Sequence, residues 1–183
     1  MNELSTHIHH ELIEQCLAGN SRAYERLYKL YHRSMYNTGF RIVLDEAEAE
    51  DVLQEAFVSA FRNLKHYRGD ASFGSWLKRI VVNKAITHVS RKKAERWPED
   101  DRFDIADVPE ADVFDSFPYN VQQVRQAIEL LPEGYRLVVS LYLLEGYDHA
   151  EIGEILGITE STSKSQFNRA KKKLKEILEG GKP

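Results

Sequence analysis

Residues 145–174 read EGYDHAEIGEILGITESTSKSQFNRAKKKL, and this stretch decides the fold predicted for the second half of the chain. Asp148 and Glu151 have the spacing of a capping box, which predicts that a helix begins there. Gly157 predicts the end of that helix, because glycine readily adopts the left-handed conformation of a C-cap. Thr159 predicts the cap of a second helix. The stretch therefore predicts two helices joined by a short turn.

The second helix of this stretch has two chemically different faces. The face that predicts packing is small or apolar and contains Ser163, Phe167, Ala170, Leu174, Ile177 and Leu178. The opposite face is polar and cationic and contains Lys164, Ser165, Gln166, Asn168, Arg169, Lys172 and Lys173. A basic helix after a short turn is typical of proteins that insert it into the DNA major groove. The alternative is a helical hairpin with a solvated lysine face. The cap, the glycine turn and the basic helix together favour DNA binding.

Two helices predicted in the first half of the chain also have distinct exposed faces. The first begins within the acidic run at residues 45–51, since carboxylates stabilise a helix N-terminus. It exposes Asp51, Gln54 and Glu55, either as a solvated face or as an acidic surface for a protein partner. The second follows a predicted loop, HYRGDASFG, at residues 66–74. Its polar face contains Arg79, Asn83, Thr87, Ser90 and Arg91. These side chains suit the phosphates and base edges of DNA.

Helical periodicity recurs along the rest of the chain, and no segment has the alternating pattern of a strand. Apolar positions expected to be buried include Leu12, Ile13, Leu17, Leu27, Tyr31, Met35, Leu53, Phe57, Phe73, Leu77, Val81, Ile128, Leu131, Leu141 and Tyr142. We therefore predict an all-α protein of two small helical domains. The first spans residues 8–96, and the second, a helix-turn-helix bundle, spans 119–179. An acidic extended linker at 97–118 joins them.

Charge is distributed unevenly around a net value of −4. Residues 99–115 contain eight acidic residues and one arginine. Residues 78–96 contain seven Lys or Arg and one Glu. Residues 164–182 contain seven Lys or Arg and two Glu. Two basic segments that flank an acidic one indicate contact with nucleic acid. Residues 97–118 also hold three of the five prolines and no glycine, which predicts an extended linker.

Composition excludes several other classes of protein. With 42% hydrophobic and 30% charged residues, the chain is typical of a soluble globular protein. No apolar run reaches about 18 residues, so we predict no direct membrane insertion. The N-terminus lacks the pattern of a signal peptide. The single cysteine, Cys16, excludes an internal disulfide and a multi-cysteine zinc site. We expect a cytoplasmic protein.

With these segments placed, the sequence resembles the extracytoplasmic-function (ECF) group of bacterial sigma factors over almost its whole length. DVLQEAF at 51–57 is similar to region 2.2 of that family, which docks on the clamp helices of the RNA polymerase β′ subunit. FGSWLKRIVVNKAITHVSRKK at 73–93 is similar to regions 2.3 and 2.4, which open and read the promoter −10 element. Residues 131–174, which include the opening stretch, are similar to region 4, which reads the −35 element.

The resemblance implies a role for each matched position. Docking on core polymerase is implied for Asp51, Gln54 and Glu55. Contact with the −10 region is implied for Asn83 and for Tyr67, Arg68, Ser72 and Phe73, which fall in a loop that captures a flipped base. Contact with the −35 element is implied for Lys164, Ser165, Asn168 and Arg169. On the same polar faces we expect Arg79, Thr87, Arg91 and Lys173 to contact DNA. The implied partners are core RNA polymerase, through its β′ clamp helices and β flap, promoter DNA and an anti-sigma factor.

Three positions depart from the family pattern. Ser163 stands where the family usually has Val and is expected to weaken the packed face of the recognition helix. Gln166 stands where Arg is usual and is expected to remove a phosphate contact. Glu160, near the N-terminus of that helix, is expected to repel phosphate, or alternatively to accept a hydrogen bond from a cytosine amino group. We therefore expect the helix to bind the −35 element weakly on its own.

The leading interpretation is a sigma factor, not an enzyme, that directs core RNA polymerase to specific promoters and aids their opening. The alternative is a stand-alone helix-turn-helix transcriptional regulator, which would have no need of the acidic DVLQEAF motif. A nucleic-acid-processing enzyme is disfavoured. The sequence shows no paired carboxylates with a metal-type partner, no phosphate-binding loop and no nucleophile beside a base. We predict no catalytic, metal-binding or cofactor-binding residue.

Overall fold

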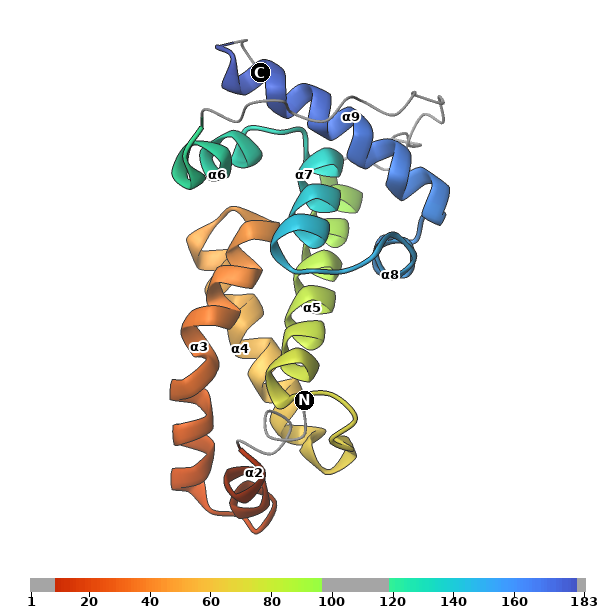
Figure 1. Ribbon diagram of the computed structural model, residues 1–183. Helices are drawn as coiled ribbons and strands as arrows, with labels where there is room; N and C mark the ends of the chain where they lie inside the picture. Colours follow the sequence, from red (N-terminus) through yellow and green to blue (C-terminus); the bar gives the residue numbers. More distant parts are fainter. Residues whose placement is uncertain (1–8, 97–118, 181–183) are drawn as a thin grey trace, which may run out of the picture. The chain divides into compact units, whose positions relative to one another are not determined.

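The computed structural model describes residues 9–96 and 119–180, without the side chains of residues 93–96. The chain divides into two compact units between Arg96 and Trp97. The regular elements of the described residues are helices, with no strand among them, which confirms the all-α prediction (Figure 1). Of these helices, none is both long enough and apolar enough to cross a membrane. The predicted linker lies outside the described residues, so its conformation and the domain bounds stay predictions.

The first unit is a bundle built on three long helices. Its elements are α2 (His10–Leu17), α3 (Ser21–Val43), α4 (Glu46–Arg62), the 3₁₀ turn η1 (Leu64–His66) and α5 (Phe73–Arg96). Helices α3, α4 and α5 each pack against the other two, and α2 packs against α3 (Figure 1). The core includes Leu27, Ile42, Leu53, Leu77, Val81 and Val82, all at most 2% exposed. Burial of each such aliphatic side chain contributes about 1.5–3 kcal/mol.

Local hydrogen bonds set both ends of α3 and the start of α4. Asn20 caps α3, because its side chain accepts from the backbone N–H of Arg22 at 3.0 Å. At the other end, Leu44 adopts a left-handed conformation with φ of 55° and ends α3. Asp45 follows directly and caps α4 by accepting from the Glu48 N–H at 3.0 Å. Two adjacent residues thus end one helix and begin the next.

The second unit is a smaller bundle that contains the helix-turn-helix. Its elements are α6 (Val121–Glu129), α7 (Glu133–Val139), the π-helical turn η2 (Ser140–Leu144), α8 (His149–Leu156) and α9 (Glu160–Leu178). Helix α9 packs against α6, α7 and α8. The buried cluster consists of Ala127, Ile128, Leu131, Val139, Ala170 and Leu174. Because this cluster spans α6, α7 and α9, one face of α9 packs against the bundle and the opposite face is accessible to solvent.

Two apolar positions predicted to be buried are substantially exposed. Leu17 is 52% exposed, because the face of α2 that packs on the bundle includes Cys16 and ends before Leu17. Tyr142 is 38% exposed, because the predicted continuous helix changes to a π turn. In that turn the Glu145 N–H donates to the Ser140 carbonyl oxygen at 3.0 Å. The wider turn rotates the side chains within it relative to a regular α-helix.

Candidate functional site

The helix-turn-helix forms with the caps that the sequence indicates. Asp148 and Glu151 make a reciprocal capping box at the start of α8. Asp148 Oδ1 accepts from the Glu151 N–H at 2.8 Å, and Glu151 Oε2 accepts from the Asp148 N–H at 2.9 Å. Gly157 ends α8 with a φ of 68°. Thr159 caps α9 by accepting from the Thr162 N–H at 3.0 Å. These short-range hydrogen bonds fix where each helix begins and ends.

Two close contacts hold α8 against α9. A Cβ atom added at Gly153 would lie 2.8 Å from the carbonyl oxygen of Ile158, so the turn requires a residue without a side chain there. His149 Nδ1 lies 2.9 Å from Ser163 Oγ, and Ser163 is fully buried. The His149 imidazole also stacks on Tyr142, with ring centroids 4.5 Å apart. The weakening of the packed face by Ser163 stays a prediction, and the structure adds that its hydroxyl makes an inter-helix contact that valine could not make.

From the surroundings of His149 we predict that the stability of the second unit depends on pH. Burial lowers the pKa of His149 and Lys164 lowers it further, whereas Glu160 and Asp148 raise it. As pH falls, the unfolded chain therefore binds this proton before the folded chain does. We expect the contribution of His149 to be fully present above about pH 6.5, the ordinary pKa of histidine, and to decline below it.

The measurement compares thermal unfolding of the full chain and of His149→Gln between about pH 7.5 and 5.5. The difference between the two pH profiles isolates this imidazole, because the other six histidines are common to both proteins. Gln is the matched variant, since its amide can still hydrogen-bond to Ser163. Parallel loss of stability in the two proteins would show that His149 contributes no pH dependence.

The cationic face of α9 lies opposite its packed face. The predicted DNA contacts on it are Lys164, Ser165, Asn168, Arg169 and Lys173; the first is exposed and the others are partly buried. Lys164 Nζ pairs with Glu160 Oε1 at 2.7 Å, and this carboxylate raises the pKa of Lys164. Lys173 Nζ pairs with Glu176 Oε2 at 3.4 Å. Lys164 and Lys173 therefore each lie beside a carboxylate in the free chain.

Gln166 does not lie on the cationic face. It is 4% exposed and shares the packed face of α9 with Ser163, Ala170 and Leu174. Residues three or four positions apart share one face of a helix, and this spacing includes Gln166. The prediction that Gln166 removes a phosphate contact is therefore wrong, because the position faces the bundle. Its Oε1 atom has no hydrogen-bond partner within the described part of the chain.

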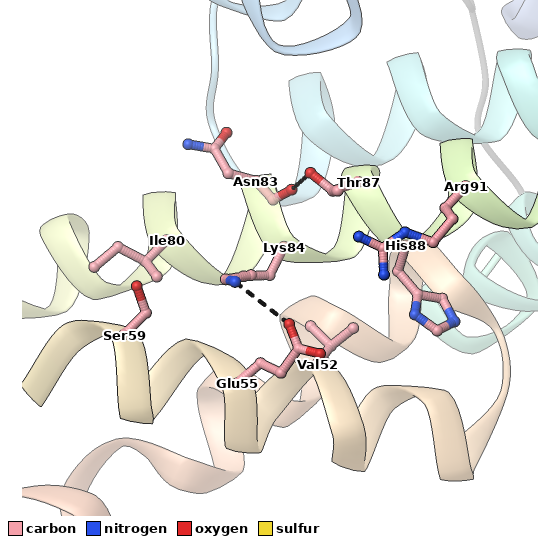
Figure 2. Close-up of a pocket in the computed structure, with 9 residues that line it drawn as sticks. All are labelled: Val52, Glu55, Ser59, Ile80, Asn83, Lys84, Thr87, His88 and Arg91. Atoms are coloured by element: carbon pink, nitrogen blue, oxygen red, sulfur yellow. Dashed lines mark hydrogen bonds and ion pairs between the residues drawn. The ribbon is translucent and has the colours of Figure 1, made fainter. Parts of the chain in front are cut away.

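The polar face of α5 forms as predicted. Its members Arg79, Asn83, Thr87, Ser90 and Arg91 are all exposed. Thr87 Oγ1 donates to the Asn83 carbonyl oxygen at 2.7 Å, so the threonine hydroxyl proton is used within the helix. Figure 2 shows the side-chain amide of Asn83 pointing away from α4. Asn83 therefore presents both donor and acceptor groups on an exposed face.

The loop between η1 and α5 is held by Tyr67. Its hydroxyl donates to the Ala71 carbonyl oxygen at 2.7 Å. Its ring contacts the rings of Phe73 and Trp76, with centroid distances of 5.7 and 5.4 Å. Burial raises the pKa of Tyr67, and Asp70 raises it further, so the hydroxyl stays protonated. These contacts give the loop a defined conformation in the free chain.

The other predicted residues of this loop have different environments. Arg68 is exposed. Ser72 Oγ accepts from the Ser75 N–H at 3.2 Å and so caps α5. Phe73 is 3% exposed and packs on the ring of Tyr31 at a centroid distance of 5.3 Å. Its ring thus lies in the core, as its apolar spacing predicts, and it packs beneath the loop; contact of Phe73 with DNA stays a prediction.

The predicted docking residues Asp51, Gln54 and Glu55 all lie on the exposed face of α4. Glu55 is also joined to the neighbouring helix, since its Oε2 lies 3.3 Å from Lys84 Nζ of α5. A second connection involves Glu48, which lies 3.3 Å from His88 Nε2 and pairs with Lys92. The sequence reasoning missed these cross-helix pairs.

A signal for these pairs was present in the spacing. Glu48 and Glu55 are seven positions apart on α4, and Lys84, His88 and Lys92 follow at intervals of four on α5. Each set forms one row along its helix. An acidic row and a basic row can pair only where the two helices pack with those rows facing each other, and the sequence alone does not give that rotation.

A groove of about 320 Å³ runs between α4 and α5 (Figure 2). It is lined by Val52, Glu55, Ser59, Ile80, Asn83, Lys84, Thr87, His88 and Arg91. The groove thus brings together a predicted docking residue and three predicted DNA contacts. Among the residues that the structure describes, no three His, Cys, Asp or Glu side chains gather in a way that could hold a metal ion.

Two family models match the two units. The model described as Sigma-70 region 2 matches residues 27–95, and so covers most of α3 together with α4, η1 and nearly all of α5. The model described as Sigma-70, region 4 matches residues 121–174, from the start of α6 into α9. Both kinds of sigma region that the sequence resembles are therefore present, in the expected order.

Relatives with sigma-factor names cover nearly the whole chain. The ECF RNA polymerase sigma factor SigM of Mycobacterium tuberculosis is 32% identical over 169 residues, which cover 92% of this chain and 83% of that protein. The RNA polymerase sigma-H factor of Pseudomonas aeruginosa is 31% identical over 182 residues, which cover 92% and 93%. The chain therefore belongs to the ECF RNA polymerase sigma factors, a family of transcription initiation factors.

Two solved structures share the fold. One is the sigma factor RpoE of Bartonella quintana in complex with the anti-sigma factor NepR, at a TM-score of 0.57 and 18% identity over 85% of this chain and 96% of that one. The other is CnrH in complex with the cytosolic domain of CnrY, at a TM-score of 0.54 and 23% identity over 93% of this chain and 97% of that one. A stand-alone regulator is disfavoured, because the region 2 match covers a unit that such a protein does not need.

Proposed function

We propose that this sigma factor binds core RNA polymerase through the exposed face of α4 and reads promoter −10 and −35 elements with α5 and α9. The observation that carries the proposal is the placement of two chemically different exposed faces on neighbouring helices of one bundle. Helix α4 offers the carboxylates of Asp51 and Glu55, and α5 offers Asn83, Thr87 and Arg91. Docking at the first face then positions the second face on DNA.

The loop before α5 is proposed to receive a base from the opened strand. Extracting a base from the stack costs a few kcal/mol, which a preformed site offsets. Tyr67 is already held by its ring contacts with Phe73 and Trp76, so little further ordering is needed. The exposed Arg68 supplies a cation for the backbone phosphate, and Ser72 lies at the start of the reading helix.

The recognition helix is proposed to combine base and phosphate contacts. Asn168 and Ser165 have side chains suited to base edges, whereas Arg169 suits either guanine or phosphate. Lys164 must leave Glu160 before it can bind phosphate, because the two form an ion pair in the free chain. The −35 interaction of the free chain is therefore weak, and it depends on being positioned by polymerase.

We also propose partners beyond DNA and the β′ clamp helices. Family membership supports contact of the second unit with the β flap of polymerase. The complex of RpoE with the anti-sigma factor NepR supports a similar inhibitory partner for this chain. The site of action is the cytoplasm, where polymerase and promoters are found. The chain supplies recognition in this proposal, and polymerase supplies the bond-forming chemistry.

Reconstituted transcription tests the proposed function. Core RNA polymerase, with and without the full chain, is given genomic DNA fragments, and the 5′ ends of the transcripts are mapped. We expect new start sites that require the chain and that share one −10 and one −35 motif. A chain that binds DNA without core polymerase and produces no new start sites would instead be a stand-alone regulator.

A further inference from the structure

Lys84 lies at the boundary between the proposed docking face and the proposed DNA-reading face. It lines the groove between α4 and α5 together with Asn83, Thr87 and Arg91. Figure 2 shows its side chain reaching across this groove to Glu55, and the two charged groups lie 3.3 Å apart. Lys84 belongs neither to the predicted docking residues nor to the predicted DNA contacts. Its present partner, however, is a residue of the proposed polymerase-docking face.

Both side chains of the Glu55–Lys84 ion pair are accessible to solvent. The Glu55 side chain is 65% exposed and that of Lys84 is 40% exposed. Ion pairs with this much exposure add little stability, because water solvates both charges when they separate. The neighbouring pair differs, since the Glu48 side chain is only 20% exposed and contacts both His88 and Lys92. The Glu55–Lys84 pair can therefore open with little loss of stability, whereas the contacts of Glu48 are more shielded from water.

Docking on polymerase would remove Glu55 from Lys84. An acidic face binds a protein surface through cations on the partner, and a carboxylate engaged by such a cation no longer neutralises Lys84. Lys84 then carries an unpaired charge next to the helix face that reads DNA. A lysine in that position binds a backbone phosphate and releases a counterion from the DNA.

We propose that Lys84 is a further DNA contact, which exchanges Glu55 for a backbone phosphate when the chain assembles with core polymerase. This inference rests on the proposed function for the identity of the docking partner. The exchange couples the two binding events, and the coupling is reciprocal. Polymerase strengthens DNA binding by exposing Lys84, and DNA strengthens polymerase binding by freeing Glu55.

The first arm of the test uses the full chain without polymerase. Binding to a labelled duplex of about 30 base pairs is measured between about 50 and 200 mM salt for wild type, Glu55→Gln, Lys84→Gln and the double variant. Glu55→Gln mimics docking, so we expect it to raise DNA affinity about two- to threefold at the low end of this range. We also expect the slope of log K against log salt concentration to become steeper by up to about 0.9, the value for one phosphate contact. The double variant is expected to lose this gain.

Glu25→Gln and Lys29→Gln provide matched controls. These residues form an exposed ion pair on α3, away from the groove. They undergo the same changes of net charge, so they report the general electrostatic effect. If Glu55→Gln raises affinity no more than Glu25→Gln, or if its gain persists without Lys84, then no exchange to phosphate occurs and the proposal is overturned.

The second arm uses the holoenzyme on a promoter found in the transcription assay. There Lys84→Gln is expected to reduce the salt dependence by about 0.9, equivalent to one phosphate contact, whereas Lys29→Gln leaves it unchanged. An unchanged salt dependence with Lys84→Gln would reject the contact. Failure of the proposed function is a separate result. It would appear as an absence of chain-dependent transcription with the wild-type chain, whereas the DNA-binding measurements of the first arm would still report on Lys84.

Discussion

Asp51→Lys is expected to weaken binding of the full chain to core RNA polymerase by about thirtyfold or more, the equivalent of losing one partner of an interfacial charge pair. Asp51 lies on the exposed face of α4, beside Gln54 and Glu55. The substitution removes an attractive charge and adds a repulsive one on the proposed docking face. Its effect on folding should be small, because the position is exposed and lysine has a high helix propensity.

Binding is measured by titrating labelled chain with core polymerase, and unfolding is followed in parallel. Glu11→Lys is the control, because it makes the same charge reversal at an exposed position of α2. We expect the control to bind normally and both variants to unfold cooperatively. Normal core binding by Asp51→Lys would mean that polymerase does not dock on this face of α4.

Arg169→Ala is expected to cost about 1–3 kcal/mol of promoter binding by the holoenzyme. Arg169 lies on the cationic face of α9, and truncation removes its charge and its hydrogen-bond donors. The salt dependence separates two possible roles. If Arg169 contacts a phosphate, its loss reduces the slope of log K against log salt concentration by about one. If it contacts a guanine edge, its loss instead relaxes the preference at one base position.

Lys175→Ala is the matched control for this experiment. Lys175 lies in the last turn of α9, is exposed and pairs with Glu179 at 3.9 Å. It loses the same charge outside the set of predicted contacts, so transcription from the cognate promoter should change little. If Arg169→Ala behaves like the control, the cationic face of α9 does not read the −35 element.

Features decided by neighbouring residues could be predicted from the sequence. The caps at Asp148 and Thr159 and the left-handed residue Gly157 depend on hydrogen bonds within a few positions, and the structure confirms all three. The exposed faces of α4 and α5 were predictable for a related reason. Once a segment is helical, its apolar spacing decides which side packs and which side is left to solvent.

Features decided by packing between elements could not be predicted. Glu55 and Lys84 are 29 positions apart, and their contact depends on how α4 and α5 are rotated about their axes. Gln166 is polar, yet it occupies the packed face of α9 because the spacing of its neighbours places it there. Phe73 is buried, as its apolar spacing predicts, but its ring contact with Tyr31 of α3 depends on how the two helices pack.

The hydrogen-bonded contact between His149 and Ser163 has a consequence for chimeric sigma factors. Exchanging the recognition helix for one from a relative would be a direct way to test which promoter it reads. A donor helix with an apolar residue at position 163 would leave His149 without its partner at the interface of α8 and α9. Because His149 is only partly buried, loss of this hydrogen bond is expected to cost about 1 kcal/mol. His149 and residue 163 should therefore be exchanged together, so that promoter choice changes without loss of stability.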